Sequence, residues 1–175
     1  MTQAMGVVLA LAAICGPAWA EEGDRERDRS EVMISPRARL GMGAGYGSPL
    51  GASATAELMY GLGADVREES DRVKALAGLL MQLHAGTTGG KLSLGVGARA
   101  HARSEDFNGS ATAALKLSLA RTWRSPLGDP GRRTYLGPEL ELSVLHVNLG
   151  LGVLARLRGS TGSRVLVSWD LGARF

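Results

Sequence analysis

The sequence contains very little cysteine and few aromatic residues. Cys15 is the single cysteine among 175 residues, which excludes a disulfide framework and a zinc site built from several thiolates. Tryptophan, tyrosine and phenylalanine together make up 5% of the chain. No apolar run approaches the roughly 20 residues that a membrane-spanning helix needs, so a helical membrane protein is excluded.

Glycine, by contrast, is abundant. The chain has 25 glycines, about twice the usual share of ~7%, and they lack the three-residue period of collagen. Hydrophobic residues make up 45% and charged residues 21%, a balance that argues against intrinsic disorder. The net charge is +3 and the pI is about 9.4. The arginines are spread along the chain, so we expect no nucleic-acid partner.

The first twenty residues have the pattern of a secretory signal peptide. Met1 to Ala20 contains no charged side chain, and its apolar core, Gly6 to Ile14, is too short to span a membrane. It ends in Ala18-Trp19-Ala20, an A-x-A pattern that predicts cleavage after Ala20. A buried N-terminal helix is the alternative. Cleavage would also remove Cys15 and leave a cysteine-free chain.

Residues 21–35 are expected to form a flexible, solvated lead-in. From Glu21 to Glu31 nearly every residue is charged and the signs alternate, so the segment has no apolar face to bury. A short charged helix is the competing interpretation.

From residue 36 onward, apolar and polar residues alternate with period two. Lys91 to Arg103 shows this best, because every second residue from Leu92 to Ala102 is apolar and the others are polar or glycine. A strand sorts such a pattern onto two faces, whereas a helix would scatter it. Eight segments follow the pattern: 37–47, 53–61, 73–85, 91–103, 111–123, 135–145, 147–158 and 164–175. The pattern of 73–85 also suits a helix.

The predicted strands are longer than those of most soluble proteins. A tilted transmembrane strand needs about 9–11 residues, whereas soluble strands more often have about 5–6. The even strand number, the export signal and the terminal Phe175 resemble the small outer-membrane β-barrels of Gram-negative bacteria, of the OmpA and OmpX type. The expected fold is therefore all-β, an eight-stranded antiparallel up-and-down transmembrane β-barrel over residues 36–175.

The last strand resembles the signal that such proteins present to the barrel-assembly machinery during biogenesis. Its residues are Val165, Val167, Trp169, Leu171 and Phe175. The resemblance implies location in the outer membrane and contact with its lipid and lipopolysaccharide. Arg132 and Arg133, in the longest loop expected outside, suit lipopolysaccharide phosphates; solvated loop charges are the alternative. We expect a monomer.

An even strand number places both chain ends in the periplasm. The turns at 48–51, 86–90, 124–134 and 159–163 then lie outside, and those at 64–72, 104–110 and 145–148 lie in the periplasm. Tyr46, Trp123 and Tyr135 are expected near the outer rim, and Tyr60, Trp169 and Phe175 near the periplasmic rim, as two aromatic girdles.

The interior of an eight-stranded barrel is just wide enough to be filled by side chains. The predicted lumen network is Arg39, Glu57, Lys74, Arg99, Lys116, Glu139, Glu141, Arg156 and Asp170. Unpaired charge there would cost several kcal/mol, so pairing is expected. Counting across hairpins suggests three pairs: Lys116 with Glu141, Glu139 with Arg156, and Glu57 with Arg39. Inward glycines then provide space for the long side chains.

The favoured function is a structural or interaction barrel without catalysis, cofactor or metal. A small, porin-like channel or a conduit for a hydrophobic ligand is one alternative. A lipid A-modifying acyl-transfer enzyme is another, suggested by resemblance and by His84, His101 and His146, of which His84 and His101 are expected too far apart to cooperate. A soluble, lipocalin-like barrel would place the apolar face inside.

Overall fold

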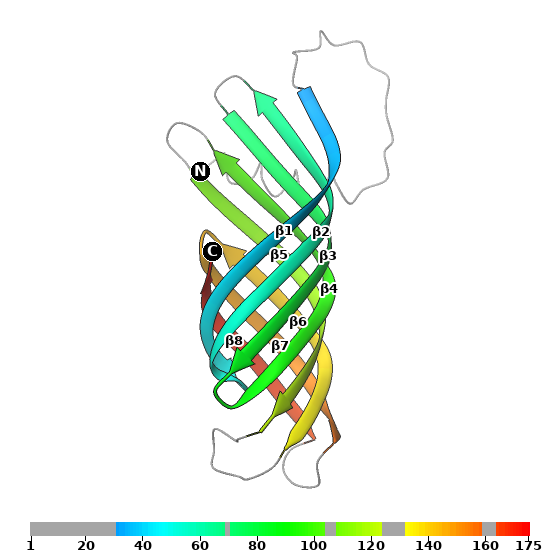
Figure 1. Ribbon diagram of the computed structural model, residues 1–175, viewed down its shortest axis with the longest axis vertical. Coiled ribbons are helices and arrows are strands. Elements are labelled where there is room, and N and C mark those ends of the chain that lie inside the picture. The colour runs from blue at the N-terminus through cyan, green and yellow to red at the C-terminus, as the bar shows by residue number, and fades with distance from the viewer. Residues whose placement is uncertain (1–30, 69–70, 104–107, 124–131, 159–163) are drawn as a thin grey trace.

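The computed structural model describes residues 31–68, 71–103, 108–123, 132–158 and 164–175 (Figure 1). The predicted signal peptide and residues 21–30 of the lead-in lie outside this range. The described residues form eight strands: β1 (Glu31–Ser48), β2 (Gly51–Glu68), β3 (Asp71–Gly86), β4 (Gly89–Arg103), β5 (Asn108–Thr122), β6 (Arg133–Val144), β7 (Val147–Arg158) and β8 (Val165–Arg174). None of the described segments is a helix long and apolar enough to cross a membrane.

The eight strands form one antiparallel sheet that closes on itself. Each strand pairs with the next along the chain, and β8 pairs with β1. The order confirms the predicted all-β, up-and-down eight-stranded barrel. The segment 73–85, whose pattern also suited a helix, is the central part of β3.

The barrel is staggered by ten residues. A path that follows paired residues around the ring leaves β1 at Ser35 and returns to it at Gly45. It passes through Gly63, Leu76, Arg99, Thr112, Ser143, Asn148 and Gly172. Tilted strands need such a stagger to close into a barrel.

The apolar residues of the alternating pattern face outward, and the polar residues and glycines face inward. Leu40 is 79% exposed and Val167 is 64% exposed. Lys116 and Glu141, at most 2% exposed, lie inside. This is the reverse of a soluble barrel, which keeps its apolar face within.

The first five strands extend beyond the other three at the end of the barrel where β1 begins (Figure 1). β1 and β2 have 18 residues each, whereas β8 has 10. We call this extension the projecting sheet, and it comprises residues 31–41, 59–68, 71–78, 99–103 and 108–110.

β1 begins at Glu31, so residues 31–35 belong to the barrel wall and not to the expected lead-in. β2 likewise continues to Glu68, through part of the turn expected at 64–72. The alternation explains both extensions, because Ile34 continues the outward row of β1 and Leu62 that of β2. The long connection expected on the periplasmic side is thus mostly strand.

Candidate functional site

The barrel interior holds a network of buried charged side chains, and Lys116 lies at its centre. Lys116 Nζ lies 2.6 Å from Glu141 Oε2 and 3.8 Å from Glu139 Oε1. It also donates a hydrogen bond of 2.7 Å to Gln82 Oε1. The side chains of Lys116 and both glutamates are fully buried. The ammonium group therefore has two hydrogen-bond acceptors and a second carboxylate nearby in place of water.

Lys91 extends the network toward β8. Its Nζ lies 2.6 Å from Glu139 Oε1 and 3.5 Å from Asp170 Oδ2. The other Glu139 oxygen accepts a hydrogen bond of 2.6 Å from Ser118 Oγ. Asn148 donates to the remaining oxygen of Asp170 at 3.1 Å. Both carboxylates are thus bonded through both oxygens, which lowers the cost of burying them.

Arg174 joins the two ends of the sheet from the inside. Its Nη1 lies 2.6 Å from Glu57 Oε2 and 2.5 Å from Glu141 Oε1. β1 stands between β8 and β2, and its inward residues here are Gly41 and Gly43. Because these glycines carry no side chain, Arg174 reaches across β1 to Glu57.

Gln82 and His84 complete the network on β3. Gln82 Nε2 donates to Glu57 Oε2 at 2.8 Å and to Glu141 Oε2 at 3.1 Å. His84 Nδ1 forms a hydrogen bond of 3.0 Å with Thr55 Oγ1, and its Nε2 lies 3.4 Å from Gln82 Oε1. Four carboxylates and three cations are thus held together, with neutral groups bridging them.

Apolar clusters bound the network on both sides along the barrel. On β5 the inward residues run Ala114, Lys116, Ser118, Ala120. Ala114 belongs to a cluster with Met59 and Leu80, partly covered by Leu76. Ala120 belongs to a second cluster with Tyr135 and Leu154, partly covered by Leu166. The interior is therefore filled by side chains in layers.

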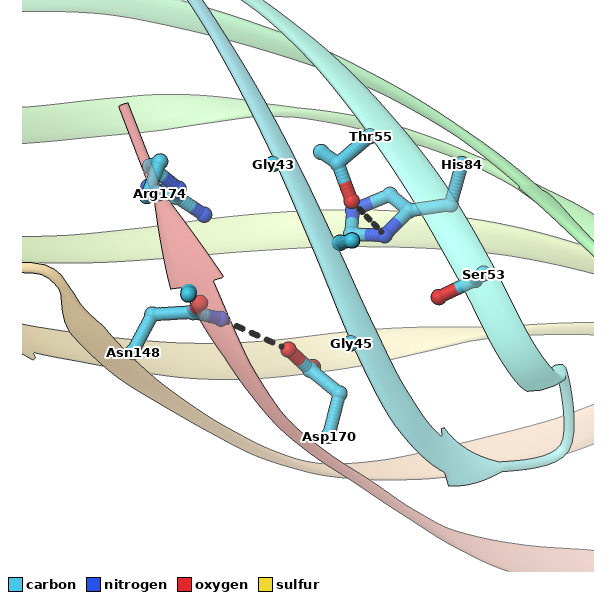
Figure 2. Close-up of a pocket in the computed structure, with 10 residues that line it drawn as sticks. Gly43, Gly45, Ser53, Thr55, His84, Asn148, Asp170 and Arg174 are labelled. Carbon is cyan, nitrogen blue, oxygen red and sulfur yellow. Dashed lines mark hydrogen bonds between the residues drawn. The ribbon is translucent and has the colours of Figure 1, made fainter.

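A small cavity lies beside the network and is lined by residues of β1, β2, β3, β7 and β8 (Figure 2). Figure 2 shows Thr55 and His84 on one side of it and Asn148 and Asp170 on the other. Its volume is about 10 Å³, space for about one water molecule. Arg174 also lines it and has a buried Nη2 without a hydrogen-bond partner. A single ordered water would satisfy this group.

Inward glycines make space for the charged side chains. A Cβ atom at Gly150 would collide with the carboxylate of Asp170. At Gly152 it would lie 2.8 Å from the backbone oxygen of Pro138 and 3.1 Å from the side chain of Glu139. The high glycine content thus has a packing reason at these positions.

Five of the nine residues predicted for the lumen network lie in it: Glu57, Lys116, Glu139, Glu141 and Asp170. The expected ion pair of Lys116 with Glu141 is present. Two other expected pairings are wrong, because Glu139 pairs with Lys91 instead of Arg156, and Glu57 pairs with Arg174 instead of Arg39.

The other four predicted residues lie elsewhere. Arg39, Lys74 and Arg99 belong to the projecting sheet, and Lys74 is exposed there. Arg156 lies near the opposite end of the barrel, in register with Tyr135. Counting residues across single hairpins did not reveal that these side chains lie at different positions along the barrel axis, because such counting contains no information about the stagger of the whole ring.

Sequence reasoning placed Lys91, Gln82 and Arg174 on polar faces but did not assign them to the network. The signal was present, since each continues the inward row of its strand. Arg174 and Glu57 come from strands that are not neighbours, so counting across single hairpins does not bring them together.

The expected aromatic girdles need two corrections. Tyr135 is 4% exposed and packs inside, because it shares the inward row of Gly137 and Glu139. Trp169 lies beside Tyr46, with ring centroids 6.2 Å apart, near the turn between β1 and β2. It is therefore at the end expected to be outside. Tyr46, Tyr60, Trp123 and Phe175 are exposed as outward residues.

The residues of the expected assembly signal form the outward row of β8. Val165, Val167, Trp169 and Leu171 are all exposed, and Phe175 follows at the end of the strand. Phe175 exchanges backbone hydrogen bonds with Met42 of β1, and its ring stacks on His146 at 5.8 Å.

The three histidines lie in three different parts of the molecule. His84 is in the network, His101 faces Lys74 on the projecting sheet, and His146 is in the turn between β6 and β7. Within the described part of the chain, no group of three or more histidine, cysteine or acidic residues is placed to hold a metal ion.

Comparisons with protein-family models, with curated proteins and with solved structures found no match to this chain.

Proposed function

We propose that the protein is an outer-membrane β-barrel of the structural or interaction type, without catalysis, whose interior is closed by the buried charge network. One observation supports the proposal above all. The barrel exposes large apolar side chains such as Leu117 and Leu151 and buries ionisable ones such as Glu139 and Lys116. In water, both the exposure of apolar side chains and the burial of ionisable ones are unfavourable. Lipid around the barrel would favour the apolar outer surface.

The outward row of β8 and the exposed aromatics fit the same proposal. Val167 and Leu171 would contact lipid in the membrane and, before that, the assembly machinery. Tyr46, Trp123 and Trp169 would lie at the lipopolysaccharide side, and Tyr60 and Phe175 at the periplasmic side. All five are exposed. Such rings prefer the interface between hydrocarbon and water.

The two apolar clusters and the ion pairs favour a closed barrel over a channel. An ion crossing the interior would have to displace Lys116 from Glu141, at a cost of several kcal/mol. The cavity beside His84 and Thr55 has space for about one water and none for an acyl chain. A structural or interaction role therefore fits the interior better than conduction or lipid modification.

Cell fractionation and planar-bilayer recording test the proposal together. We expect the native protein in the outer-membrane fraction, extracted by detergent, with a gel mobility that changes on heating. In planar bilayers we expect no reproducible unitary currents. Recovery in the soluble periplasm would overturn the membrane location, and reproducible currents would support the channel instead. A changed lipid A mass in cells that lack the protein would support the enzyme.

A further inference from the structure

The projecting sheet ends in an edge that no described residue covers. β1 pairs with β8 only from Gly43 to Ser48, and Met42 exchanges backbone hydrogen bonds with Phe175. Over residues 31–41, none of the described residues pairs with β1 on the side away from β2. The N–H and C=O groups of such an edge are a template for a strand of another polypeptide.

The hydrogen bonds of Met42 show which groups this edge offers. Both its N–H and its C=O point away from β2. Groups in an antiparallel pair alternate in direction, and the pairing of β1 with β2 contains no bulge, so Leu40, Ala38 and Ile34 also point away from β2. Pro36 lies in the same row and has no N–H, as expected at an edge. The edge is therefore complementary to an extended main chain.

The inner face of the projecting sheet, beside this edge, is basic. Among the side chains that the structure describes there, Asp65 is the one acid, and it pairs with Arg37 at 3.9 Å. Lys74 stands directly opposite His101, so two basic side chains are neighbours on one face. The basic residues of the face are Arg37, Arg39, Lys74, Arg99, His101 and Arg103.

Arg39 and Arg99 lack an acidic partner among the described residues. Neither forms an ion pair with them, and the buried Nε of Arg99 has no hydrogen-bond acceptor there. Arg99 is within electrostatic reach of Arg39, which repels it, and of Glu57, which already pairs with Arg174. Because like charges on one face destabilise a sheet, a ligand that brings negative charge to this face is favoured.

The edge and the charge act on the same ligand because Arg37 and Arg39 belong to the edge strand. Leu40 and Ala38 hold the hydrogen-bonding groups of the edge, so the two arginines take the non-hydrogen-bonded positions toward an antiparallel neighbour. Side chains directly opposite at such positions point to the same face and approach each other most closely. Acidic residues two apart in an incoming strand would thus lie beside both arginines.

We infer that the projecting sheet binds an extended segment of another protein, which pairs antiparallel with residues 34–41 of β1 and carries acidic residues at alternate positions. Its main chain bonds to the edge, and its carboxylates lie against Arg37 and Arg39. Arg99 and Lys74 add to the positive field that attracts it. The inference names a partner that the proposed function leaves open, and it does not require the proposed membrane location.

An NMR titration of residues 21–175, folded in zwitterionic micelles, tests the inference. The probe is a capped peptide of about eight residues that alternates valine and glutamate. We expect it to slow amide exchange at Ala38 and Leu40 by on the order of tenfold at saturation. The control peptide alternates valine and lysine and is expected to leave both amides unchanged. The amides of Arg37 and Arg39 point toward β2 and report that the sheet stays folded.

Two variants separate the contributions of charge and edge. Arg37→Gln with Arg39→Gln is expected to weaken binding of the glutamate peptide on the order of tenfold. The matched control, Arg121→Gln with Arg158→Gln, makes the same charge change at the far ends of β5 and β7 and is expected to keep the affinity. Ala38→Pro removes one edge N–H without touching the pairing of β1 with β2, and is expected to weaken binding as strongly as the loss of both arginines.

Several outcomes would overturn the inference. They include no binding of the glutamate peptide, equal binding of the lysine peptide, and an affinity that Ala38→Pro leaves unchanged, since the last would show attraction without strand pairing. Binding that requires removal of residues 21–30 would assign the edge to the chain itself. Protection of Ala38 and Leu40 that rises with protein concentration, without peptide, would assign it to a second copy. The membrane location is tested separately by fractionation, so the two failures are distinguishable.

Discussion

The closed barrel and the projecting sheet have the same alternating pattern, but they use it differently. In the closed barrel the outward row is rich in leucine and valine, and the inward charges of the network are paired. In the projecting sheet the outward row mixes alanines such as Ala64 and Ala75 with larger apolar residues such as Leu62. Its inward charges are mainly arginine and lysine. One wall thus has a part whose inward charges are paired and a part whose inward charges are mostly positive.

If the protein is the outer-membrane barrel that we propose, this difference indicates which part of the wall would lie in the membrane. The hydrocarbon core demands a closed ring, because an open sheet edge there would leave backbone groups without partners. Among the described residues, only the closed part of the wall meets this demand, since none of them pairs with β1 over residues 31–41 on the side away from β2. On the proposed orientation, the projecting sheet therefore extends into the periplasm.

Removing one acid from the network is expected to have the largest effect. Glu141→Gln deprives Lys116 and Arg174 of a buried carboxylate, and we expect a loss of about 3–5 kcal/mol in the free energy of unfolding. Urea unfolding in micelles measures it. The control is Arg103→Gln on the projecting sheet, which is exposed and is expected to change stability by about 0.5 kcal/mol or less. If the two variants lost the same free energy of unfolding, the charges of the closed barrel and of the projecting sheet would not differ in their contribution to stability.

Charges placed on the outer surface are expected to have the next largest effect. Leu117→Arg, on the closed barrel, is expected to cost about 2–4 kcal/mol on folding into lipid vesicles. Leu62→Arg, on the projecting sheet, is the matched control and is expected to cost about 0–1 kcal/mol. Both leucines are exposed, at 54% and 63%, so burial within the protein does not account for the difference. A larger cost at Leu62 would reverse the assignment of the two regions.

A methyl group added inside the closed barrel is expected to have the smallest of the three effects. Gly150→Ala places a Cβ against the Asp170 carboxylate and is expected to cost about 1–3 kcal/mol. At Gly41 the nearest atoms to an added Cβ are at 3.6 Å or more, so Gly41→Ala is expected to change stability by less than about 0.5 kcal/mol. Thermal or urea unfolding compares them. Identical costs would show that the inward glycines do not make space for the network.

Much of the fold could be predicted from the sequence. The alternation identifies all eight strands and the face of most residues, including Lys116 inside and Leu117 outside, although Tyr135 was expected outside. Counting across the hairpin of β5 and β6 also gives the ion pair of Lys116 with Glu141. These features depend on local period, which the sequence records directly.

The arrangement across strands could not be predicted. The stagger of ten residues decides that Trp169 lies beside Tyr46 and that Glu57 meets Arg174 across β1. It depends on how the whole ring closes, and no single hairpin specifies it. The projecting sheet was missed for another reason, because Gly61, Gly63 and Asp65 give the end of β2 the composition of a turn.

The most direct test of the account is the environment of two spin labels on the folded protein in lipid vesicles. The chain after Ala20 has no cysteine, so a nitroxide can be attached at Leu117→Cys or at Leu62→Cys alone. The account predicts that the label at 117 is relaxed by oxygen, which enters lipid, and not by a water-soluble nickel complex. The label at 62 should show the opposite preference. A label at 117 that is open to the nickel complex would contradict a membrane-spanning closed barrel.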